Sequence, residues 1–544
     1  MPTPIDVLVV GAGPSGLTAA HLLALHGIRL RVINLDSGPT DESRATVVHG
    51  RTLELWDKLE LADKAILNGV KVTGATLIRH GQVLARLPIS GAEEGHRTPF
   101  PFSLIHEQSK TERLLLDALE PLGIRVEWNT EYLKLEQADE VVQVRVRSAE
   151  REEVIHARWV IACDGARSPI RHTLGIPFAG KTYDQVAFVA DVDLETTLPR
   201  DTIHLNYFRE GFVGFVPMRD PNDKLYRLIG TLPNDLARVL AGELTDLNAE
   251  HLHYIFGQYL QSDVRIHRTH HTAIYRLHRR RVERYRVRRC FLVGDAAHVH
   301  SPAGGQGMNT GVGDAYNLAW KLALVVKGQA QPTLLESYEP ERIAVAKAVL
   351  SGSDRGFGLE ATKQPALQWF NNHLLPAFIR FGSRFSVVRR FAARAFSQSW
   401  INYRQSPAVS ESRRTSGPAR AGDRAPLARF TAGEPAGRTS FELLTGLDHH
   451  LLLFEGRPPA PGFALLKPAL ERMLGAYHAP VHIHTLSSQN RDALEAYGVK
   501  QTTYFLIRPD GHIAFRGGRL DLPVFESFLN HVFVRRNGSS KPLA

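Results

Sequence analysis

The chain has 544 residues, 43% of them hydrophobic and 22% charged, which is ordinary globular composition and excludes a disordered, collagenous or small disulfide-stapled protein. The formal charge of +10 favours anionic partners, with nucleic acid the first to consider. The two cysteines, Cys163 and Cys290, are too few for a disulfide framework or a zinc site, so no metal is expected and a reducing cytoplasm is the expected location.

The first predicted elements form a strand, a glycine turn, a helix and a second strand. Residues 5–10 are continuously apolar, which is typical of a parallel strand buried on both faces. Glycines punctuate residues 11–16, and a helical repeat over 17–25 and a strand over 30–35 follow. Residues 7–25 lack acidic and basic side chains, but the glycines interrupt them and no basic segment precedes them. Neither a membrane span nor a signal peptide is therefore expected.

Two more buried strands are predicted, and each ends in an aspartate. Residues 159–163 run into Asp164, and residues 290–293 run into Gly294 and Asp295, ahead of a long helix over 311–326. The segment between these strands alternates apolar and polar residues, as at 186–192 and 202–208. We interpret 177–275, together with part of 70–105, as an inserted sheet domain.

The C-terminal part is predicted to be a separate α/β unit. Residues 401–440 are rich in Ser, Arg, Pro, Gly and Ala, as in a linker. Beyond them, short strands are predicted at 451–454 and 481–485, a hairpin around Pro509-Asp510-Gly511, and a helix over 523–533.

The glycine turn has the GxGxxG pattern of a dinucleotide-binding loop. Gly11 would make the tight turn, Gly13 would let a pyrophosphate approach the backbone, and Gly16 would let the helix pack closely. An acidic residue should follow the second strand to hold a ribose, but Asn34 stands there, with Asp36 two residues on. A carboxylate would bind more strongly than the Asn34 amide, so ribose binding is weaker or Asp36 substitutes.

Two later motifs, in combination with the glycine loop, identify a family. They are Cys163-Asp-Gly-Ala-Arg-Ser168 and Gly294-Asp-Ala-Ala-His298, and the second continues as His298-Val-His-Ser-Pro-Ala-Gly-Gly-Gln-Gly-Met-Asn309. With residues 37–45 and 314–322, they make the sequence resemble the class A FAD-dependent aromatic monooxygenases, which include phenol and polyketide hydroxylases. The likeness extends over nearly the whole chain.

The resemblance implies roles for individual residues. For the adenine and pyrophosphate half of FAD, it implies Gly11, Gly13, Gly16, Asn34 and, through its backbone, Tyr132. For the flavin half it implies Arg44 and Gln108 along the ring, Asp295 on the ribityl chain, and Asp164, which serves both FAD and the reduced nicotinamide. Beside the isoalloxazine ring it places a loop containing Pro302, Gly304, Gly305, Gly307, Met308 and Asn309.

The implied reaction has two halves. NADH or NADPH reduces FAD, and dioxygen then forms a flavin C4a-hydroperoxide that hydroxylates an electron-rich ring. The protein would orient the reactants and exclude water, but no acid or base residue is identified. His49 could lie near the flavin, although a single histidine is more often structural. An aromatic run could line the substrate site or form the sheet core: Tyr207, Phe208, Phe212 and Phe215.

The implied fold is α/β. It has a discontinuous Rossmann-like FAD domain of the glutathione reductase type over 1–176 and 276–400, the inserted sheet domain, and a linker with a thioredoxin-like extension over 401–544. No cysteine follows Cys290, which excludes thiol redox chemistry in that extension.

Several alternatives stay open at this stage. Baeyer–Villiger oxygenation on the same scaffold, or a non-catalytic flavin-binding protein, would keep the same motifs. A flavin halogenase is disfavoured, because no two tryptophans have the Trp-x-Trp spacing. The arginines over 279–289 are expected to be a solvated face, or less readily a site for NADPH phosphates. We expect a monomer or homodimer with no nucleic-acid or membrane partner.

Overall fold

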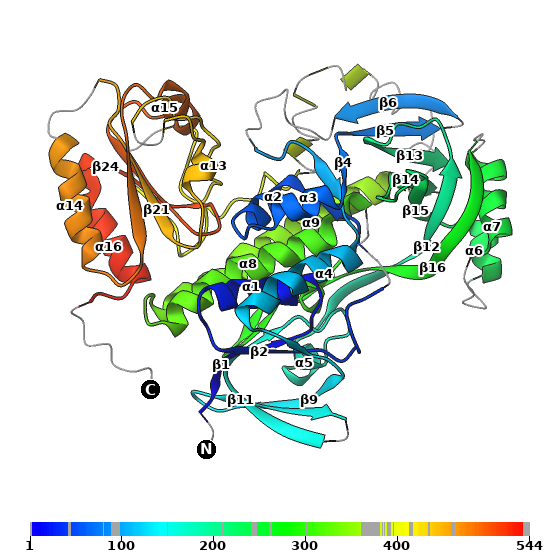
Figure 1. Ribbon diagram of the computed structural model, residues 1–544, viewed down its shortest axis with the longest axis horizontal. Helices are drawn as coiled ribbons and strands as arrows, with labels where there is room; N and C mark the ends of the chain where they lie inside the picture. Colours follow the sequence, from blue (N-terminus) through cyan, green and yellow to red (C-terminus); the bar gives the residue numbers. More distant parts are fainter. Residues whose placement is uncertain are drawn as a thin grey trace.

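The protein is a mixed α/β structure with several sheets, as the computed structural model shows (Figure 1). The structure describes residues 3–41, 45–79, 81–88, 98–149, 151–208, 211–240, 247–260, 264–300, 303–360, 381–382, 385, 387–388, 393–394, 397–412, 417–433, 436–458 and 463–536.

The first sheet is built on parallel strands in the order β18-β11-β1-β2-β8, with β17 beside β18, and β10 and β9 added antiparallel. Their bounds are β1 (Ile5–Val10), β2 (Leu30–Ile33), β8 (Val126–Glu127), β9 (Thr130–Gln137), β10 (Val142–Ser148), β11 (Arg151–Ala162), β17 (Arg286–Val287) and β18 (Cys290–Leu292). The inner strands bury apolar side chains on both faces, which explains their continuously apolar sequences.

The helices of this part of the chain gather mostly on one side of the first sheet (Figure 1). They are α1 (Pro14–Leu25), α2 (Gly50–Asp57), α3 (Ala62–Leu67), α4 (Gln108–Leu119), α5 (Pro169–Thr173), α8 (Gln306–Val326) and α9 (Tyr338–Glu360), with short 3₁₀ turns η1 (Glu120–Leu122), η3 (Gly294–Ala296), η4 (Ala303–Gly305) and η5 (Pro332–Ser337). Helix α8 is buried along most of its length and packs against α1. Pro14 begins α1, where its missing N–H is not needed, and Gly27 with φ +72° follows its end.

A second sheet has the order β19-β16-β12-β15-β14-β13-β5-β6. The bounds are β5 (Gly74–Arg79), β6 (Gln82–Pro88), β12 (Ala179–Glu195), β13 (Thr202–Phe208), β14 (Gly211–Pro217), β15 (Leu225–Thr231), β16 (Arg265–Arg281) and β19 (His298–Val299). Helices α6 (Asn234–Leu240) and α7 (Ala249–Tyr254), with a π-helical turn, η2 (Ile255–Leu260), lie on the side of this sheet away from α8 (Figure 1). Strands β3 (Val47–Val48), β7 (Ser103–Ile105) and β4 (Val70–Val72) form a small sheet.

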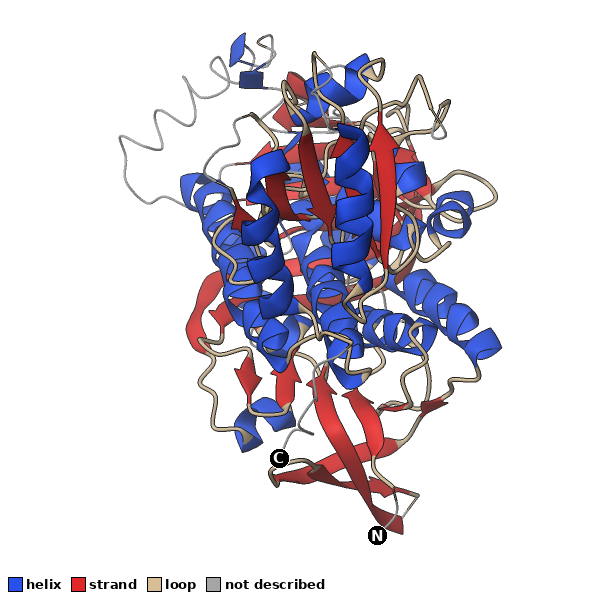
Figure 2. Cartoon of the chain, turned by 90° about the vertical axis from the view of Figure 1, so that its left-hand side faces the viewer, coloured by secondary structure: helices blue, strands red, loops and turns tan. Residues whose placement is uncertain are grey.

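The C-terminal sheet has the order β20-β24-β23-β21-β22. Its strands are β20 (Ser410–Glu411), β21 (His449–Phe454), β22 (Val481–Leu486), β23 (Thr503–Ile507) and β24 (Ile513–Gly518), and its helices are α13 (Ser440–Leu443), α14 (Phe463–Gly475), α15 (Arg491–Tyr497) and α16 (Leu522–Val532), with η6 (Arg519–Asp521). Helices α14 and α16 cover its outer face (Figures 1 and 2). The connecting segment supplies the edge strand β20, so it is part of this unit.

The predicted elements are present with shifted ends. The helix predicted over 311–326 begins five residues earlier, at Gln306, because the glycines before residue 311 hide its first turn in the sequence. The strand predicted over 30–35 ends at Ile33, and the side chain of the next residue, Asn34, contacts the glycine loop. The hairpin around Pro509-Asp510-Gly511 pairs β23 with β24, and Gly511 has the positive φ that its turn requires.

Candidate active site

Three sequence motifs meet at one edge of the first sheet. Strands β1, β11 and β18 are parallel neighbours, so the residues that follow them lie together. A Cβ on Gly11 would lie 2.2 Å from the Cys163 carbonyl oxygen, and a Cβ on Gly294 would lie 2.7 Å from the Ser15 hydroxyl. The glycine loop, the Asp164 motif and the Asp295 motif are therefore in direct contact.

The glycine loop has the shape that a phosphate site needs. A Cβ on Gly16 would lie 1.9 Å from the Gly11 carbonyl oxygen, so helix α1 can approach the loop only with glycine there. Among the described residues, nothing would lie within 4 Å of a Cβ on Gly13, so they leave its backbone accessible from outside. Gly13 is also the N-cap of α1 and makes no side-chain cap. The first N–H groups of α1 can therefore bind an anion.

Asn34 contacts the glycine loop and is held there by Asp36. Its Oδ1 accepts a hydrogen bond from the backbone N–H of Ala12 at 3.0 Å, and its Nδ2 donates to Asp36 at 3.1 Å. These two partners fix the orientation of the amide. The acidic group next to the loop is thus supplied by Asp36, through Asn34.

Asp164 presents a carboxylate oxygen to the same region. Its Oδ2 accepts from the backbone N–H of Ile170 at 3.1 Å, whereas Oδ1 is buried and lacks a hydrogen-bond partner within the described part of the chain. Burial raises the pKa of this carboxyl. A hydroxyl donor would satisfy the oxygen, and the ribose and ribityl hydroxyls of FAD are such donors. Arg171 binds the Ala166 and Ala296 carbonyls and so ties this motif to the next one.

The loop before α8 depends on left-handed glycines. Gly304 and Gly305 have φ values of +77° and +62°, which other residues rarely adopt. A Cβ on Gly305 would lie 2.7 Å from the Val47 Cβ. The N–H groups of the first turn of α8, including those of Gly307 and Met308, lie at a helix start that no described side chain caps.

Asn309 supports this loop with its whole side chain. Its Nδ2 donates to the carbonyls of Val47 and Gly305, both at 2.7 Å. Its Oδ1 accepts from the His49 N–H at 2.8 Å and the Thr52 hydroxyl at 2.7 Å. Four hydrogen bonds exhaust an amide, so this side chain positions the loop and has no capacity left for a cofactor.

His49 also supports the loop. Its Nε2 lies 3.0 Å from the Gly304 carbonyl, and only 1% of the residue is exposed. Burial lowers the pKa of His49 to about 4. The ring is therefore neutral near pH 7, with Nε2 donating its proton to the Gly304 carbonyl.

A buried ion cluster lies behind the same motifs. Asp314 accepts from the Gly294 N–H, from His298 at 2.8 Å and from Arg342 at 2.5 Å. Burial would raise the pKa of Asp314, but Arg342 and His298 lower it below its usual range. The carboxylate stays ionised and fixes the segment that leads into the loop.

The aromatic run divides between the two faces of the second sheet. Phe208 and Phe215 belong to the core beneath the π-helical turn, where the ring of Phe215 packs at a tilt against that of Phe256, with centroids 5.5 Å apart. Tyr207 and Phe212 are cross-strand partners on the opposite face, with ring centroids 6.2 Å apart. Phe215 therefore packs in the core and does not line that face, whereas Tyr207 and Phe212 are only partly buried on it.

Comparisons with known proteins agree with this geometry. The family model described as FAD binding domain matches residues 4–353. The 6-methylpretetramide 4-monooxygenase of Streptomyces rimosus is 34% identical over 536 residues, covering 94% of this chain and 91% of the relative. The chain belongs to the FAD-dependent aromatic monooxygenases.

Other proteins similar to this monooxygenase are consistent with the family. Pentachlorophenol 4-monooxygenase of Sphingobium chlorophenolicum is 33% identical over 357 residues, covering 64% of this chain and 63% of the relative. The solved anhydrotetracycline hydroxylase OxyS of Streptomyces rimosus is 25% identical with a TM-score of 0.75, covering 98% of this chain and 99% of its own. The monooxygenase PieE, solved with FAD and substrate, shares the fold at a TM-score of 0.79, with 23% identity and coverage of 97% and 100%.

The cofactor of the monooxygenase is FAD, and the resemblance seen in the sequence is confirmed at family level. The open backbone at Gly13 and the unpartnered Asp164 oxygen fit its pyrophosphate and hydroxyl groups. Gln108 begins α4 and donates to Glu112 at 2.9 Å, Tyr132 lies on β9, and Asp295 is exposed in η3. Arg44 and Pro302 lie outside the described residues.

Sequence reasoning missed most of the supporting residues of the monooxygenase. Asp314 and Arg342 are 28 positions apart, and Asn309 acts on residues more than 250 positions away. Only the family-like stretch 314–322 pointed to Asp314. Burial raises the pKa of the Cys290 thiol to about 12, which fits the core position that the sequence predicted for it. Within the described residues, no helix of the monooxygenase is long and apolar enough to cross a membrane.

Proposed function

We propose that this monooxygenase hydroxylates an aromatic ring, with NADH or NADPH as electron donor. One substrate C–H becomes C–OH, the second oxygen atom of O2 leaves as water, and the nicotinamide is oxidised with uptake of one proton. The observation that carries the proposal is the direct contact of the glycine loop, the Asp164 motif and the Asp295 motif beside the start of α8.

The residues that would hold FAD follow from this contact. The backbone at Gly13 and the start of α1 would bind the pyrophosphate, with Asn34 and Asp36 beside the ribose. Asp164 and Asp295 would accept hydrogen bonds from cofactor hydroxyls, and the backbone of Tyr132 would lie at the adenine. Bound FAD supplies electron transfer from the nicotinamide and activation of dioxygen.

The helix start at Gly305 would act on the flavin ring. The N–H groups of its first turn and the positive end of the α8 dipole stabilise negative charge placed next to them. Gly304, Gly307 and Met308 belong to the same turn, and Pro302 and Arg44 complete the family pattern. His49 and Asn309 would hold this turn rigid, so their role is to position it.

The substrate is proposed to be a phenol or a polycyclic aromatic compound. The relatives named above carry out oxygenation of 6-methylpretetramide and pentachlorophenol, as their names state. Tyr207 and Phe212 would contact its ring, because their partly exposed faces offer aromatic packing. We expect Phe212→Leu to raise KM while leaving FAD affinity unchanged. Phe215→Leu, the matched core change, should lower stability instead.

A coupled assay tests the proposal. The purified protein should bind FAD and turn yellow, and a phenol or polycyclic substrate should accelerate NADH or NADPH oxidation. The product should gain one oxygen atom on an intact aromatic ring. An ester or lactone would establish Baeyer–Villiger oxygenation, and FAD binding without turnover across the panel would favour a non-catalytic flavin protein. A protein that stays colourless with added FAD contradicts the proposal.

The chain is proposed to divide into three parts. The FAD domain would comprise 1–176 and 276–400, and the sheet domain 177–275 with part of 70–105. The remainder, 401–544, would be the linker and a thioredoxin-like unit without thiol chemistry. The sheet order β24-β23-β21-β22, with β21 and β22 parallel and β23 antiparallel, supports the last assignment.

A further inference from the structure

The turn of the C-terminal hairpin is buried against the helices that carry the candidate flavin site. We call residues 508–512 the hairpin turn. Arg508 is 1% exposed and donates to both oxygens of Glu341 on α9, at 2.7 and 2.9 Å. Glu341 also accepts from Lys321 on α8 at 2.8 Å. These contacts join residues up to 167 positions apart, and they fix the position of the C-terminal unit against α8 and α9.

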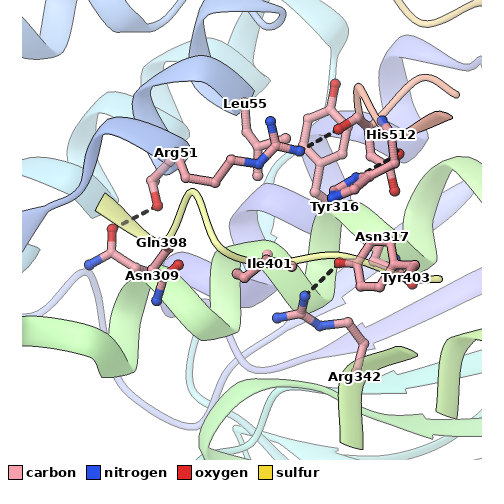
Figure 3. A pocket seen from close by; sticks show the side chains of 13 residues that line it. Arg51, Leu55, Asn309, Tyr316, Asn317, Arg342, Gln398, Ile401, Tyr403 and His512 are labelled. Carbon is pink, nitrogen blue, oxygen red and sulfur yellow. Dashed lines mark hydrogen bonds and ion pairs between the residues drawn. The ribbon is translucent and has the colours of Figure 1, made fainter. Parts of the chain in front are cut away.

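One chain of contacts leads from this turn to the Asp295 motif. The ring of His512 packs on the ring of Tyr403 with centroids 4.3 Å apart. The Tyr403 hydroxyl accepts from Arg342 at 2.8 Å, and Arg342 donates to Asp314. Asp314 in turn holds Gly294 and His298. Figure 3 shows the first part of this chain, with the hydrogen bond from Arg342 to Tyr403.

A second chain of contacts leads to the glycines before α8. Arg51 on α2 donates to the Asp510 carbonyl at 2.5 Å. Its neighbour Thr52 donates to Asn309, and His49 at the start of the same helix bonds to Gly304. A small cavity of about 20 Å³ lies between these two series of contacts, and Arg51, Tyr403 and His512 are among its lining residues (Figure 3).

We propose that the hairpin turn holds the loop before α8 in its working geometry, and that Tyr403 and Arg51 are positioning residues for the flavin site. The inference rests on the proposed role of that loop. Left-handed glycines at 304 and 305 give the loop little rigidity of its own, so its shape depends on what surrounds it. A buried polar network holds its members in one geometry only while every partner is present.

Tyr403→Phe tests the first series of contacts, with Tyr477→Phe as the matched control. Both tyrosines are at most 5% exposed, and each hydroxyl makes a 2.8 Å hydrogen bond, but that of Tyr477 goes to Asn530 inside the C-terminal unit. Hydrogen exchange of residues 303–309 should accelerate at least threefold in the Tyr403 variant only. Its FAD dissociation constant should rise three- to tenfold, with a shifted flavin absorption spectrum.

Arg51→Met tests the second series of contacts, with Arg516→Met as its control. Arg516 is also buried, at 2% exposure, and binds a carbonyl and a carboxylate, those of Ala419 and Glu411, away from the loop. We expect the same acceleration and loss of FAD affinity for the Arg51 variant alone.

The outcomes separate this inference from the proposed function. Exchange of residues 303–309 and FAD affinity that match the controls in both test variants would overturn the positioning role while leaving the proposed function intact. A wild-type protein that binds no FAD would overturn both.

Discussion

Asn34 offers a sharp test of how the glycine loop is held. Replacing it by aspartate would install the acidic residue that dinucleotide-binding loops usually carry there. In this structure, however, Asn34→Asp would place a carboxylate where the amide Nδ2 now lies 3.1 Å from Asp36. The usual residue should therefore be unfavourable in this chain.

The expected magnitude follows from the geometry. Two like charges about 3 Å apart in water repel by about 1.4 kcal/mol. Losing a solvent-exposed hydrogen bond to a carboxylate costs about 0.5 kcal/mol more. We expect Asn34→Asp to lower the free energy of unfolding by about 2 kcal/mol, and FAD affinity should not increase. The double variant Asn34→Asp/Asp36→Asn exchanges the two groups, so it should recover most of the loss.

Urea denaturation of the apoprotein and fluorescence titration with FAD measure the two quantities. Asp36→Asn alone is the control, because it removes a charge without creating repulsion. The reasoning fails if Asn34→Asp is as stable as the wild type and binds FAD more tightly. Position 34 would then contact the ribose directly, and Asp36 would have no supporting role.

Three further predictions concern the same site and its stability. The Gly13→Ala variant should fold normally but bind FAD at least tenfold more weakly. The Gly16→Ala variant should fail to give a stable fold, because its Cβ would lie 1.9 Å from a carbonyl oxygen. Thermal melting and FAD titration distinguish the two variants. Asn309→Asp should lower the free energy of unfolding by about 3 kcal/mol, since a carboxylate would face the Val47 and Gly305 carbonyls. The exposed control, Asn68→Asp, should leave the free energy of unfolding unchanged. Urea denaturation measures both. Burial lowers the pKa of four described histidines to about 4: His21, His26, His49 and His106. Between pH 6.5 and 4 the unfolded chain binds protons at these histidines that the native chain does not. The free energy of unfolding should therefore fall by about 2 kcal/mol per histidine from pH 7 to pH 5. Equal urea midpoints at both pH values would contradict this.

Local patterns predicted the scaffold of the site but little of its support. The run before Gly11 and the runs before Asp164 and Asp295 could be identified as parallel strands from their apolar sequences, and parallel strands bring their ends together. Arg342 and Arg508 carry no such signal. Both are 1% exposed, yet arginine is rarely so buried. Arg342 pairs with Asp314, 28 positions away, and Arg508 pairs with Glu341, 167 positions away, as well as with the nearby Asp510.

The sequence also could not show which hydrogen bonds a side chain makes or which face of a sheet is covered. The resemblance implies a place beside the flavin ring for Asn309, but only the structure reveals that its side chain makes four hydrogen bonds within the protein. The split of Tyr207 and Phe215 between opposite faces follows from strand alternation. Which face packs beneath the π-helical turn does not follow, because it depends on the placement of residues 255–260.

Strand β20 has a practical consequence for anyone who moves the C-terminal unit between proteins. The segment before the first long strand of that unit is no passive spacer, because Ser410 and Glu411 close one edge of its sheet against β24. A fusion that begins at residue 440 would expose the backbone N–H and C=O groups of β24 that β20 now pairs, and exposed sheet edges promote aggregation. The transplantable module therefore begins ahead of Ser410, about forty residues before its β21 strand at His449.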